Sequence, residues 1–175
     1  MVKSDNYYDS IAKGYNELHA EEQLKKLEII GKELKTNPDL SGFMKPNYSL
    51  LDVGCGTGIS TGFFNCKTRI GIDPSKNLIA IAKTHYPMID FQVCGAEDIS
   101  FKDKKFDIVI SLTAIQNFSD LEKGLSEIKH VGKDKFILTF LKKSQKNKQI
   151  DEFIRKKFDV IKFIDEEKDY IYFCR

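Results

Sequence analysis

The sequence predicts an α/β protein in which a mostly parallel β-sheet carries helices on both faces and ends in an antiparallel hairpin. Short apolar runs alternate with helix-like segments from residue 48 onward, which is typical of βαβ units. Several runs are apolar at every position, as in strands that helices cover on both sides. The last two runs, 159–164 and 169–174, are only four residues apart, which suits a hairpin and is too short for a parallel crossover.

The chain has 175 residues, enough for one domain with a sizeable core. Residues 4–36 carry apolar side chains at helical spacing and are expected to form helix. Proline and glycine in residues 38–47 predict a loop after it. We therefore expect a single domain, residues 1–175, made of an N-terminal helical part with its loop (1–47) and an α/β core (48–175).

The core is expected to alternate strands and helices. The apolar runs predict seven strands, at residues 49–53, 68–73, 91–94, 106–112, 135–141, 159–164 and 169–174. Helix-like segments lie between them, at residues 58–65, 75–84, 120–130 and 145–157. The interval between the third and fourth strands is short and polar, so any helix there is expected to be stunted.

Composition restricts the function classes. The net charge of +2 and the isoelectric point near 8.2 are too weakly basic to indicate nucleic-acid binding. No apolar run approaches the roughly 20 residues of a membrane-spanning helix, and the N-terminus lacks the apolar core of a signal peptide. The four cysteines lack zinc-ligand spacing and are expected to be reduced, mostly buried thiols. These features predict a cytoplasmic protein with no membrane segment and no metal site.

One segment carries a local excess of positive charge. Residues 142–157 contain seven Lys or Arg residues against two acids. A basic helical face can contact RNA or an acidic protein, and an ordinary solvated helix has the same pattern. Both interpretations stay open at the level of sequence.

The segment LLDVGCGTGIS, residues 50–60, is the most informative in the chain. A predicted strand leads into Gly54, Gly56 and Gly58, and a predicted helix follows. Glycines allow a sharp turn and let a ligand approach the backbone where a Cβ would obstruct it. Open α/β sheets bind ligands beyond the carboxyl ends of their strands, so we expect a binding loop here. The alternative is a tight turn without a ligand.

The spacing of this loop argues against a dinucleotide. The dinucleotide fingerprint has Gly or Ala at its third position, where this chain has Ile59. Asp52, two residues before Gly54, would bring negative charge towards a pyrophosphate. A ligand with a sulfonium and an ammonium group tolerates an acid at that point.

Asp73 ends the second predicted strand. A carboxylate at that position can accept both hydroxyls of a ribose as a bidentate pair. A nicotinamide cofactor presents a ribose there too, so Asp73 indicates a nucleoside without choosing the cofactor. Alternatively, Asp73 forms the turn that precedes Pro74.

The motifs, taken in order, resemble those of class I S-adenosylmethionine-dependent methyltransferases. LDVGCGTG (51–58) resembles their motif I, and GIDPS (71–75) their second motif. CGAEDISF (94–101) resembles the stretch after their third strand, and FDIVISLTAIQNF (106–118) their strand-four motif. YYDSIAKGY (7–15) resembles the helix that covers the cofactor in many members. The resemblance covers nearly the whole chain, including the closing hairpin.

The resemblance implies a Rossmann-like seven-stranded fold with an N-terminal helical lid, S-adenosylmethionine as cofactor and S-adenosylhomocysteine as product. Carried over position by position, it implies the following contacts. They are Asp52, Gly54, Gly56 and Gly58 at the methionine end, Asp73 at the ribose, Ile72 or Pro74 against the adenine, Ala96, Glu97 and Asp98 at the adenine edge, Ser111 and Leu112 under the sulfonium, and Tyr15 in the lid. Tyr15 is equally compatible with a place in the core.

Two departures from the family pattern affect these expectations. Gly95 stands where many members carry an acid, so Asp98 or backbone groups are expected to contact the adenine amino group instead. Gln116 and Asn117 stand where many members carry histidines, so no general base is indicated there.

Methyl transfer from a sulfonium is an in-line displacement with a good leaving group. Alignment of the two reactants supplies much of the acceleration, so a dedicated base is optional. The residues expected near the methyl group are Gln116, Asn117 and Tyr15, with His19 as a further candidate.

The predicted function is therefore methyl transfer from S-adenosylmethionine to an unidentified acceptor. A small molecule is slightly favoured over RNA or protein contacted through the lid and residues 142–157. An alternative, a non-catalytic cofactor-binding partner of another methyltransferase, fits Gly95 and the missing histidines. A nicotinamide-dependent oxidoreductase is disfavoured by Ile59 and Asp52.

Overall fold

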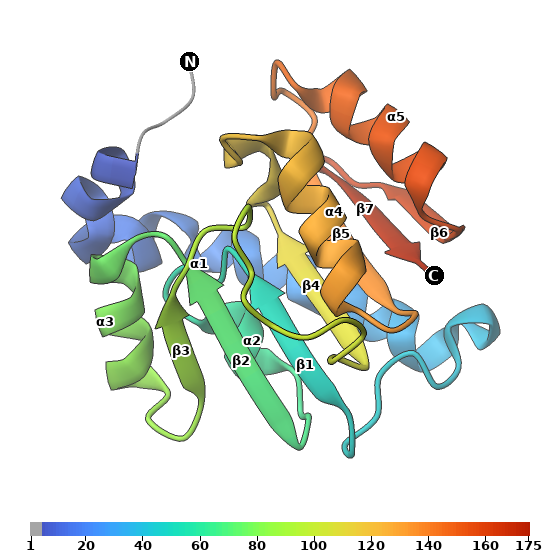
Figure 1. The fold of residues 1–175 in the computed structure, drawn as a ribbon, viewed down its shortest axis with the longest axis horizontal. Coiled ribbons are helices and arrows are strands. Elements are labelled where there is room, and N and C mark those ends of the chain that lie inside the picture. The colour runs from blue at the N-terminus through green and yellow to red at the C-terminus, as the bar shows by residue number, and fades with distance from the viewer. Residues whose placement is uncertain (1–4) are drawn as a thin grey trace.

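The computed structural model describes the backbone of residues 5–175 and the side chains of residues 20–175. The helices are α1 (Asp5–Thr36), α2 (Ile59–Phe63), α3 (Lys76–His85), α4 (Leu121–Val131) and α5 (Asn147–Lys157), with two short 3-10 helices, η1 (Pro38–Leu40) and η2 (Ile115–Asn117). The strands are β1 (Ser49–Val53), β2 (Thr68–Asp73), β3 (Asp90–Val93), β4 (Ile108–Leu112), β5 (Phe136–Leu141), β6 (Val160–Asp165) and β7 (Asp169–Cys174). Figure 1 shows how they are arranged.

The strand pairings confirm the predicted fold class. All seven strands form one sheet in the order β3-β2-β1-β4-β5-β7-β6. The pairs from β3 across to β5 are parallel, and β7 pairs antiparallel with both β5 and β6. The chain therefore builds outward from β1 to β3 and returns to the other side of β1 with β4. Ligands in open α/β sheets bind beyond the carboxyl ends of the strands at such a reversal, which here lies between β1 and β4.

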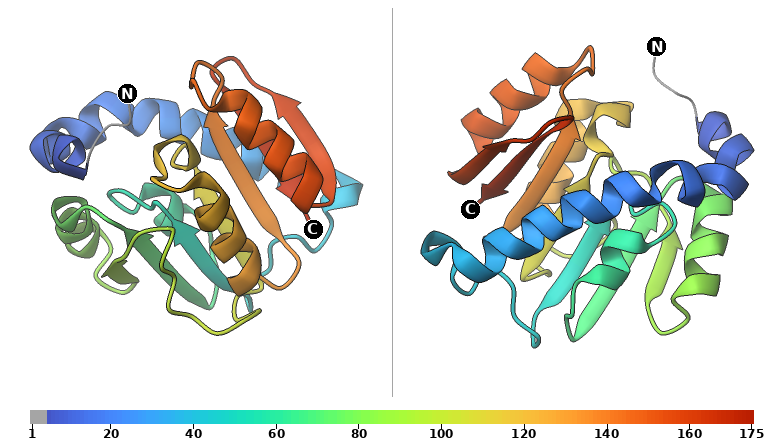
Figure 2. Two further views of the ribbon diagram at one scale, coloured as in Figure 1. Left: turned by 45° about the horizontal axis from the view of Figure 1, so that its top comes forward. Right: turned by 180° about the vertical axis from the view of Figure 1, so that it is seen from behind.

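Two apolar layers cover the sheet. α1 and α2 lie on one face, and α4 and α5 lie on the other (Figures 1 and 2). Leu27 of α1 packs in one layer with Ile110 and Phe173, and Leu125 of α4 packs in the other with Val109. Neighbouring residues of β4 thus point into opposite layers. This explains why β4 is apolar at almost every position and buried throughout.

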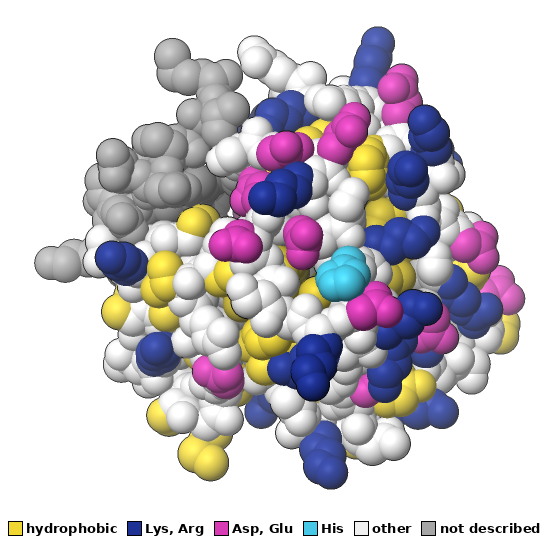
Figure 3. Space-filling view, viewed as in Figure 1, with side chains coloured by type: hydrophobic (Ala, Val, Ile, Leu, Met, Phe, Trp, Pro, Cys, Tyr) yellow, Lys and Arg dark blue, Asp and Glu magenta, His cyan; other side chains and the backbone are white. Residues whose placement is uncertain are grey.

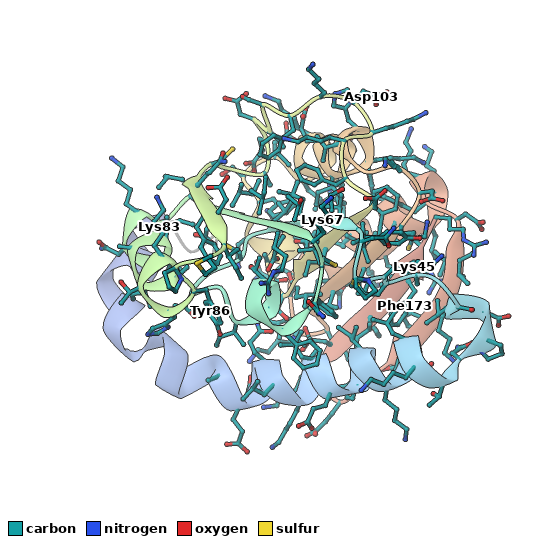
Figure 4. All side chains as sticks on the ribbon, turned by 90° about the horizontal axis from the view of Figure 1, so that it is seen from below. Lys45, Lys67, Lys83, Tyr86, Asp103 and Phe173 are labelled. Carbon is teal, nitrogen blue, oxygen red and sulfur yellow. The ribbon has the colours of Figure 1, made fainter. Side chains whose placement is uncertain are left out.

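α1 is one continuous helix of 32 residues, in agreement with the helix expected over 4–36. Figure 4 shows it running along one side of the sheet, with Phe173 on the same side and Asp103 on the opposite side. The β3–β4 connection, residues 94–107, contains no helix, as its polar composition predicts. The fourth strand begins at Ile108, later than expected, because Phe106 forms only an isolated bridge to Gly132.

The cysteines are free thiols in an apolar setting. Cys55, Cys66 and Cys174 are buried and Cys94 is half-buried. Burial raises the pKa of Cys66 to about 11 and that of Cys174 to about 12, which disfavours the reactive thiolate. No helix in the described part of the chain is long and apolar enough to cross a bilayer. The same residues contain no group of three or more His, Cys, Asp or Glu side chains that could hold a metal.

Candidate functional site

A cavity of about 290 Å³ lies at the carboxyl ends of β1, β2 and β4. Three segments border it: the glycine loop (residues 54–58), the end of β2, and the turn from β4 into η2 (residues 112–117, called here the β4–η2 turn). The connections after β3 and after η2, together with Leu78 of α3, complete its border. The cavity therefore lies at the sheet edge where the reversal of strand order predicts a ligand site.

Gly54 is the residue at which the glycine loop meets the β4–η2 turn. Its φ is +77°, and a Cβ built on it would lie 2.3 Å from the Cβ of Ala114. Any side chain here would push Ala114 away, since real Cβ contacts are never that short. Glycine is therefore required at 54 by the backbone conformation of the turn and by the close approach of the ends of β1 and β4.

Asp73 holds the glycine loop in place from the end of β2. Its Oδ2 accepts a hydrogen bond from the Gly56 amide at 2.9 Å, and its Oδ1 accepts one from the Ser75 amide at 2.9 Å. A carboxylate can accept about four hydrogen bonds. Asp73 thus forms the turn and also borders the cavity, and its contact with a ribose stays a prediction.

Asp52 lies beneath the glycine loop, fully buried, and does not border the cavity. Its Oδ2 accepts hydrogen bonds from the hydroxyls of Ser60 at 2.6 Å and Thr61 at 2.7 Å, and so anchors the start of α2. Its Oδ1 has no hydrogen-bond partner among the described residues. Burial raises the pKa of this carboxyl to about 6, and the two hydroxyls oppose the increase only in part.

Glu97 closes the far side of the cavity. Its Oε1 accepts hydrogen bonds from the backbone amides of Ser119, at 2.7 Å, and Asp120, at 3.2 Å. Its Oε2 lies 3.2 Å from where a Cβ would stand on Gly95. Glu97 therefore brings one carboxylate oxygen to the place left open by the absence of a side chain at 95.

Ser111 and Leu112, which are expected to lie under the sulfonium, are both at the carboxyl end of β4 but make different contacts. The Ser111 hydroxyl donates to the Val53 carbonyl at 2.8 Å, which ties β4 to β1 behind the cavity. Leu112 borders the cavity, and Thr113 follows it with a φ of +58°. The strand thus ends in a left-handed residue directly at the site.

Gln116 and Asn117 are separated by the structure. Gln116 Nε2 donates to the Thr113 carbonyl at 2.7 Å and so closes the β4–η2 turn, and it does not border the cavity. Gln116 Oε1 is buried and has no hydrogen-bond partner in the described part of the chain. Asn117 does border the cavity. Of the two, Asn117 is the one placed to meet a ligand.

The predicted site residues fall into two groups. Those that border the cavity are Gly54, Asp73, Pro74, Ala96, Glu97, Leu112 and Asn117. Those that lie behind or beside it are Asp52, Gly56, Gly58, Asp98, Ser111 and Gln116. The side chain of Tyr15 lies outside the described residues, so its contact with the cofactor stays a prediction, as do the ligand roles of both groups.

Sequence reasoning missed five cavity residues, which are Leu78, Thr113, Ala114, Phe118 and Ser119. Four of them lie in the segment that follows β4: Thr113 and Ala114 before η2, and Phe118 and Ser119 after it. The rule that ligands lie beyond strand ends, applied past the last residue of β4, would have found them. Leu78 belongs to α3 and gives no such signal.

The basic stretch 142–157 is partly engaged within the chain. Lys146 Nζ donates to the Phe118 carbonyl at 2.6 Å, next to the cavity, and Lys142 pairs with Asp165. Figure 3 shows Lys and Arg side chains interspersed with Asp and Glu over the face that carries α4 and α5. Contact of this stretch with RNA or an acidic protein stays a prediction.

Comparison with known proteins gives a consistent picture. The uncharacterized protein MJ1252 of Methanocaldococcus jannaschii is 35% identical over 138 residues, which cover 77% of this chain and 49% of that protein. Demethylmenaquinone methyltransferase of Chlorobaculum tepidum is 34% identical over 100 residues, which cover 55% of this chain and 40% of the relative. The chain therefore spans about half the length, or less, of these relatives.

A solved structure shares the fold across most of the chain. Magnesium protoporphyrin IX methyltransferase from Synechocystis PCC 6803 superposes with a TM-score of 0.68 at 15% identity, covering 86% of this chain and 77% of that one. Residues 51–140, about half of this chain, match the family described as a methyltransferase domain. That match runs from β1 to β5 and includes every segment that borders the cavity. The chain therefore belongs to the methyltransferase domain family, with the Rossmann-like fold of its class I members.

Proposed function

We propose that this chain binds S-adenosylmethionine in the cavity and transfers its methyl group to an acceptor, with S-adenosylhomocysteine as the product. The observation that carries the proposal is the meeting of the glycine loop, Asp73 and the β4–η2 turn around one cavity of about 290 Å³. Family membership supports the reaction class.

The residues present fit the cofactor. Asp73 closes the β2 side, where a carboxylate can accept the two ribose hydroxyls. Pro74, Leu78 and Ala96 offer apolar surface beside it for the adenine ring. At the β4 side, Gly54 and Leu112 border the cavity, where the methionine end would lie.

Glu97 is the residue we assign to the adenine amino group. Gly95 removes the acid that many family members carry, and Glu97 Oε2 lies beside the position that such a side chain would start from. Because Glu97 Oε1 is already held by two backbone amides, Oε2 is the oxygen that faces the ligand. Asp98, the substitute suggested by sequence, is exposed and does not border the cavity.

When bound, S-adenosylmethionine supplies a methyl group on a positively charged sulfur. The chain has to orient the acceptor along the line of that bond and exclude water. Well-oriented bimolecular steps gain roughly 7–11 kcal/mol from such positioning. Asn117 can hydrogen-bond an acceptor at the cavity border, and no His, Lys or Cys is among the described residues there. We therefore propose that positioning of the acceptor supplies most of the acceleration.

A small-molecule acceptor is favoured, because the basic stretch 142–157 already uses Lys142 and Lys146 internally. RNA and protein are the alternative acceptor classes, and the transfer experiment below distinguishes them from a small molecule. The second candidate function is a non-catalytic cofactor-binding partner of another methyltransferase. It is favoured by the position of Gln116, which closes the β4–η2 turn and leaves Asn117 alone as a polar amide at the site.

Titration calorimetry with S-adenosylhomocysteine tests the cofactor site. We expect micromolar binding by the native chain, loss of binding in Asp73→Ala, and native affinity in Asp103→Ala, which removes an exposed carboxylate on the far side of the sheet. Equal binding by all three would contradict the assignment of Asp73.

Methyl transfer is then tested with methyl-tritiated S-adenosylmethionine and the purified chain. Small-molecule, RNA and protein fractions of a cell extract are offered separately. Label in the small-molecule fraction is the expected result, and label only in RNA or protein would overturn that acceptor class. Binding without transfer into any fraction would favour the non-catalytic partner.

A further inference from the structure

A buried polar cluster lies directly behind the β4–η2 turn. Lys26 of α1 pairs with Asp169 at the start of β7, with Nζ 2.9 Å from Oδ2, and both side chains are almost wholly buried. Lys26 Nζ also donates to the Thr113 hydroxyl, and that hydroxyl donates to Asp169 Oδ1 at 3.2 Å. The cluster thus joins three elements that are distant in sequence.

Thr113 is held at every polar atom it has. Its amide donates to the Thr139 hydroxyl at 2.8 Å and to the Thr139 carbonyl at 3.1 Å. Its carbonyl accepts from Gln116 at 2.7 Å, and its hydroxyl contacts both members of the Lys26–Asp169 pair. No hydrogen-bonding group of this residue therefore depends on solvent or on a ligand.

These contacts surround a strained backbone. Thr113 has a φ of +58°, in the left-handed region, where a β-branched residue is a genuine outlier. Such a residue persists only where its surroundings over-determine it, and outliers of this kind cluster at functional sites. The hydrogen bonds with Thr139, Gln116, Lys26 and Asp169 fix the conformation of Thr113 in this way.

The strained residue borders the cavity. The backbone leaves β4 at Thr113 and brings Ala114 against Gly54, where only a glycine fits. Thr113 and Ala114 therefore form the part of the border that faces the glycine loop. A relaxed Thr113 would redirect Ala114 and change the space between the two segments.

Stability alone does not account for the pair. Replacing a buried ion pair by well-packed apolar residues is often neutral or stabilising, so such a pair is weak evidence for a stabilising role. The Lys26–Asp169 pair contacts Thr113, whose backbone is strained and which borders the cavity, and this points to a role at the site.

We propose that Lys26 and Asp169 are positioning residues, which hold Thr113 in its left-handed conformation and so hold the β4–η2 turn in the form that receives the sulfonium end of the cofactor. This rests on the proposed function for the identity of the ligand. Through Lys26, helix α1 is tied to the border of the cavity.

A double-mutant cycle tests the proposal. The pair variant combines Lys26→Met with Asp169→Val, so that neither charge is left buried alone. It is made in the native background and in a Thr113→Gly background, because glycine adopts a φ near +60° without strain. Lys25→Met serves as control, since Lys25 is the exposed neighbour on the same helix. The measurements are the affinity for S-adenosylhomocysteine by calorimetry and the thermal unfolding midpoint.

In the native background, we expect the pair variant to weaken binding by about tenfold, the size that backbone strain of this kind implies. In the Thr113→Gly background, the same pair of substitutions should weaken binding by less than about threefold. An equal loss in both backgrounds, or no loss in either, would overturn the proposal, because a merely structural role does not depend on residue 113.

A crystal structure of the pair variant provides a second readout that needs no ligand. The proposal predicts that Thr113 leaves the left-handed region, and a φ still near +58° would overturn it. If native chain fails to bind S-adenosylhomocysteine while Thr113 moves as expected, the proposed function fails and the positioning role stands. If native chain binds and Thr113 does not move, only the positioning role fails.

Discussion

The two sides of the cavity are built in different ways. On the β1–β2 side, hydrogen bonds join residues near in sequence, such as Asp52 to Ser60, 8 residues apart, and Gly56 to Asp73, 17 apart. On the β4 side, Lys26 reaches Thr113 across 87 residues, and Thr113 reaches Asp169 across 56. One side is therefore encoded in a short motif, and the other exists only after the sheet and α1 have assembled.

The largest expected effect is on the β4 side. Lys26→Met alone leaves the Asp169 carboxylate buried without its partner, which should lower the free energy of unfolding by about 3–5 kcal/mol. Lys25→Met removes an exposed charge and should change it by less than about 0.5 kcal/mol. Urea denaturation at neutral pH measures both. Equally small effects would mean that the cluster is open to water in solution.

The contact between the two sides is tested by Gly54→Ala. The new Cβ would meet Ala114 at 2.3 Å and carry a φ of +77°, so we expect a loss of about 2–3 kcal/mol in unfolding free energy and of cofactor binding. Adding Ala114→Gly removes the clash but not the unfavourable φ, and should restore part of both. Gly31→Ala is the matched control. Gly31 lies within α1, and its Cβ would make an ordinary contact with Phe63 at 3.4 Å.

On the β1–β2 side, Asp52 makes the free energy of unfolding depend on pH. Burial raises the pKa of Asp52 in the folded chain to about 6, from an ordinary value of 3.8, because it disfavours the charged carboxylate. Between these values the folded chain binds more protons than the unfolded one, so this group lowers stability as pH rises, by about 2–3 kcal/mol in all. Asp52→Asn removes the titration.

Thermal unfolding of both proteins from pH 4 to pH 8 checks this. The stability of Asp52→Asn relative to native should increase with pH and level off above pH 7. Using the difference cancels the other titrating groups. A difference that stays constant over this range would show that Asp52 has an ordinary pKa.

The smallest effect expected is on the adenine end. In Glu97→Gln, the amide oxygen can still accept the hydrogen bonds from the Ser119 and Asp120 amides, and an NH2 group replaces the other carboxylate oxygen. This change should weaken S-adenosylhomocysteine binding by about tenfold. S-inosylhomocysteine lacks the amino group, so native chain should prefer the adenosine compound and the variant should lose most of that preference. Glu152→Gln, an exposed residue of α5, should leave the ratio unchanged. An unchanged ratio in Glu97→Gln would remove its assigned role.

The fold was predictable because its signals are local. Each strand is a short apolar run, and the four residues between the last two runs allow only an antiparallel pair, as β6 and β7 form. The glycine loop was found because its conformation requires glycine at fixed positions, as the φ of Gly54 and Gly58 shows.

The distribution of roles within the site was not predictable. The family resemblance implied that Asp52 and Ser111 contact the ligand, and it carried no information on the partners that hold these side chains. Here Ser60 draws Asp52 beneath the loop, and the Val53 carbonyl holds Ser111 behind the cavity. Lys26 gave no signal at all, because its partners lie in other elements and a lysine in an amphipathic helix reads as solvated.

The decisive measurement is a crystal structure of the native chain with S-adenosylhomocysteine. We expect ribose hydroxyls on Asp73, the adenine amino group on Glu97 Oε2, and the sulfur in the cavity beside Gly54 and Leu112. A ligand bound elsewhere, or bound in the cavity without contact to Asp73, would contradict this expectation.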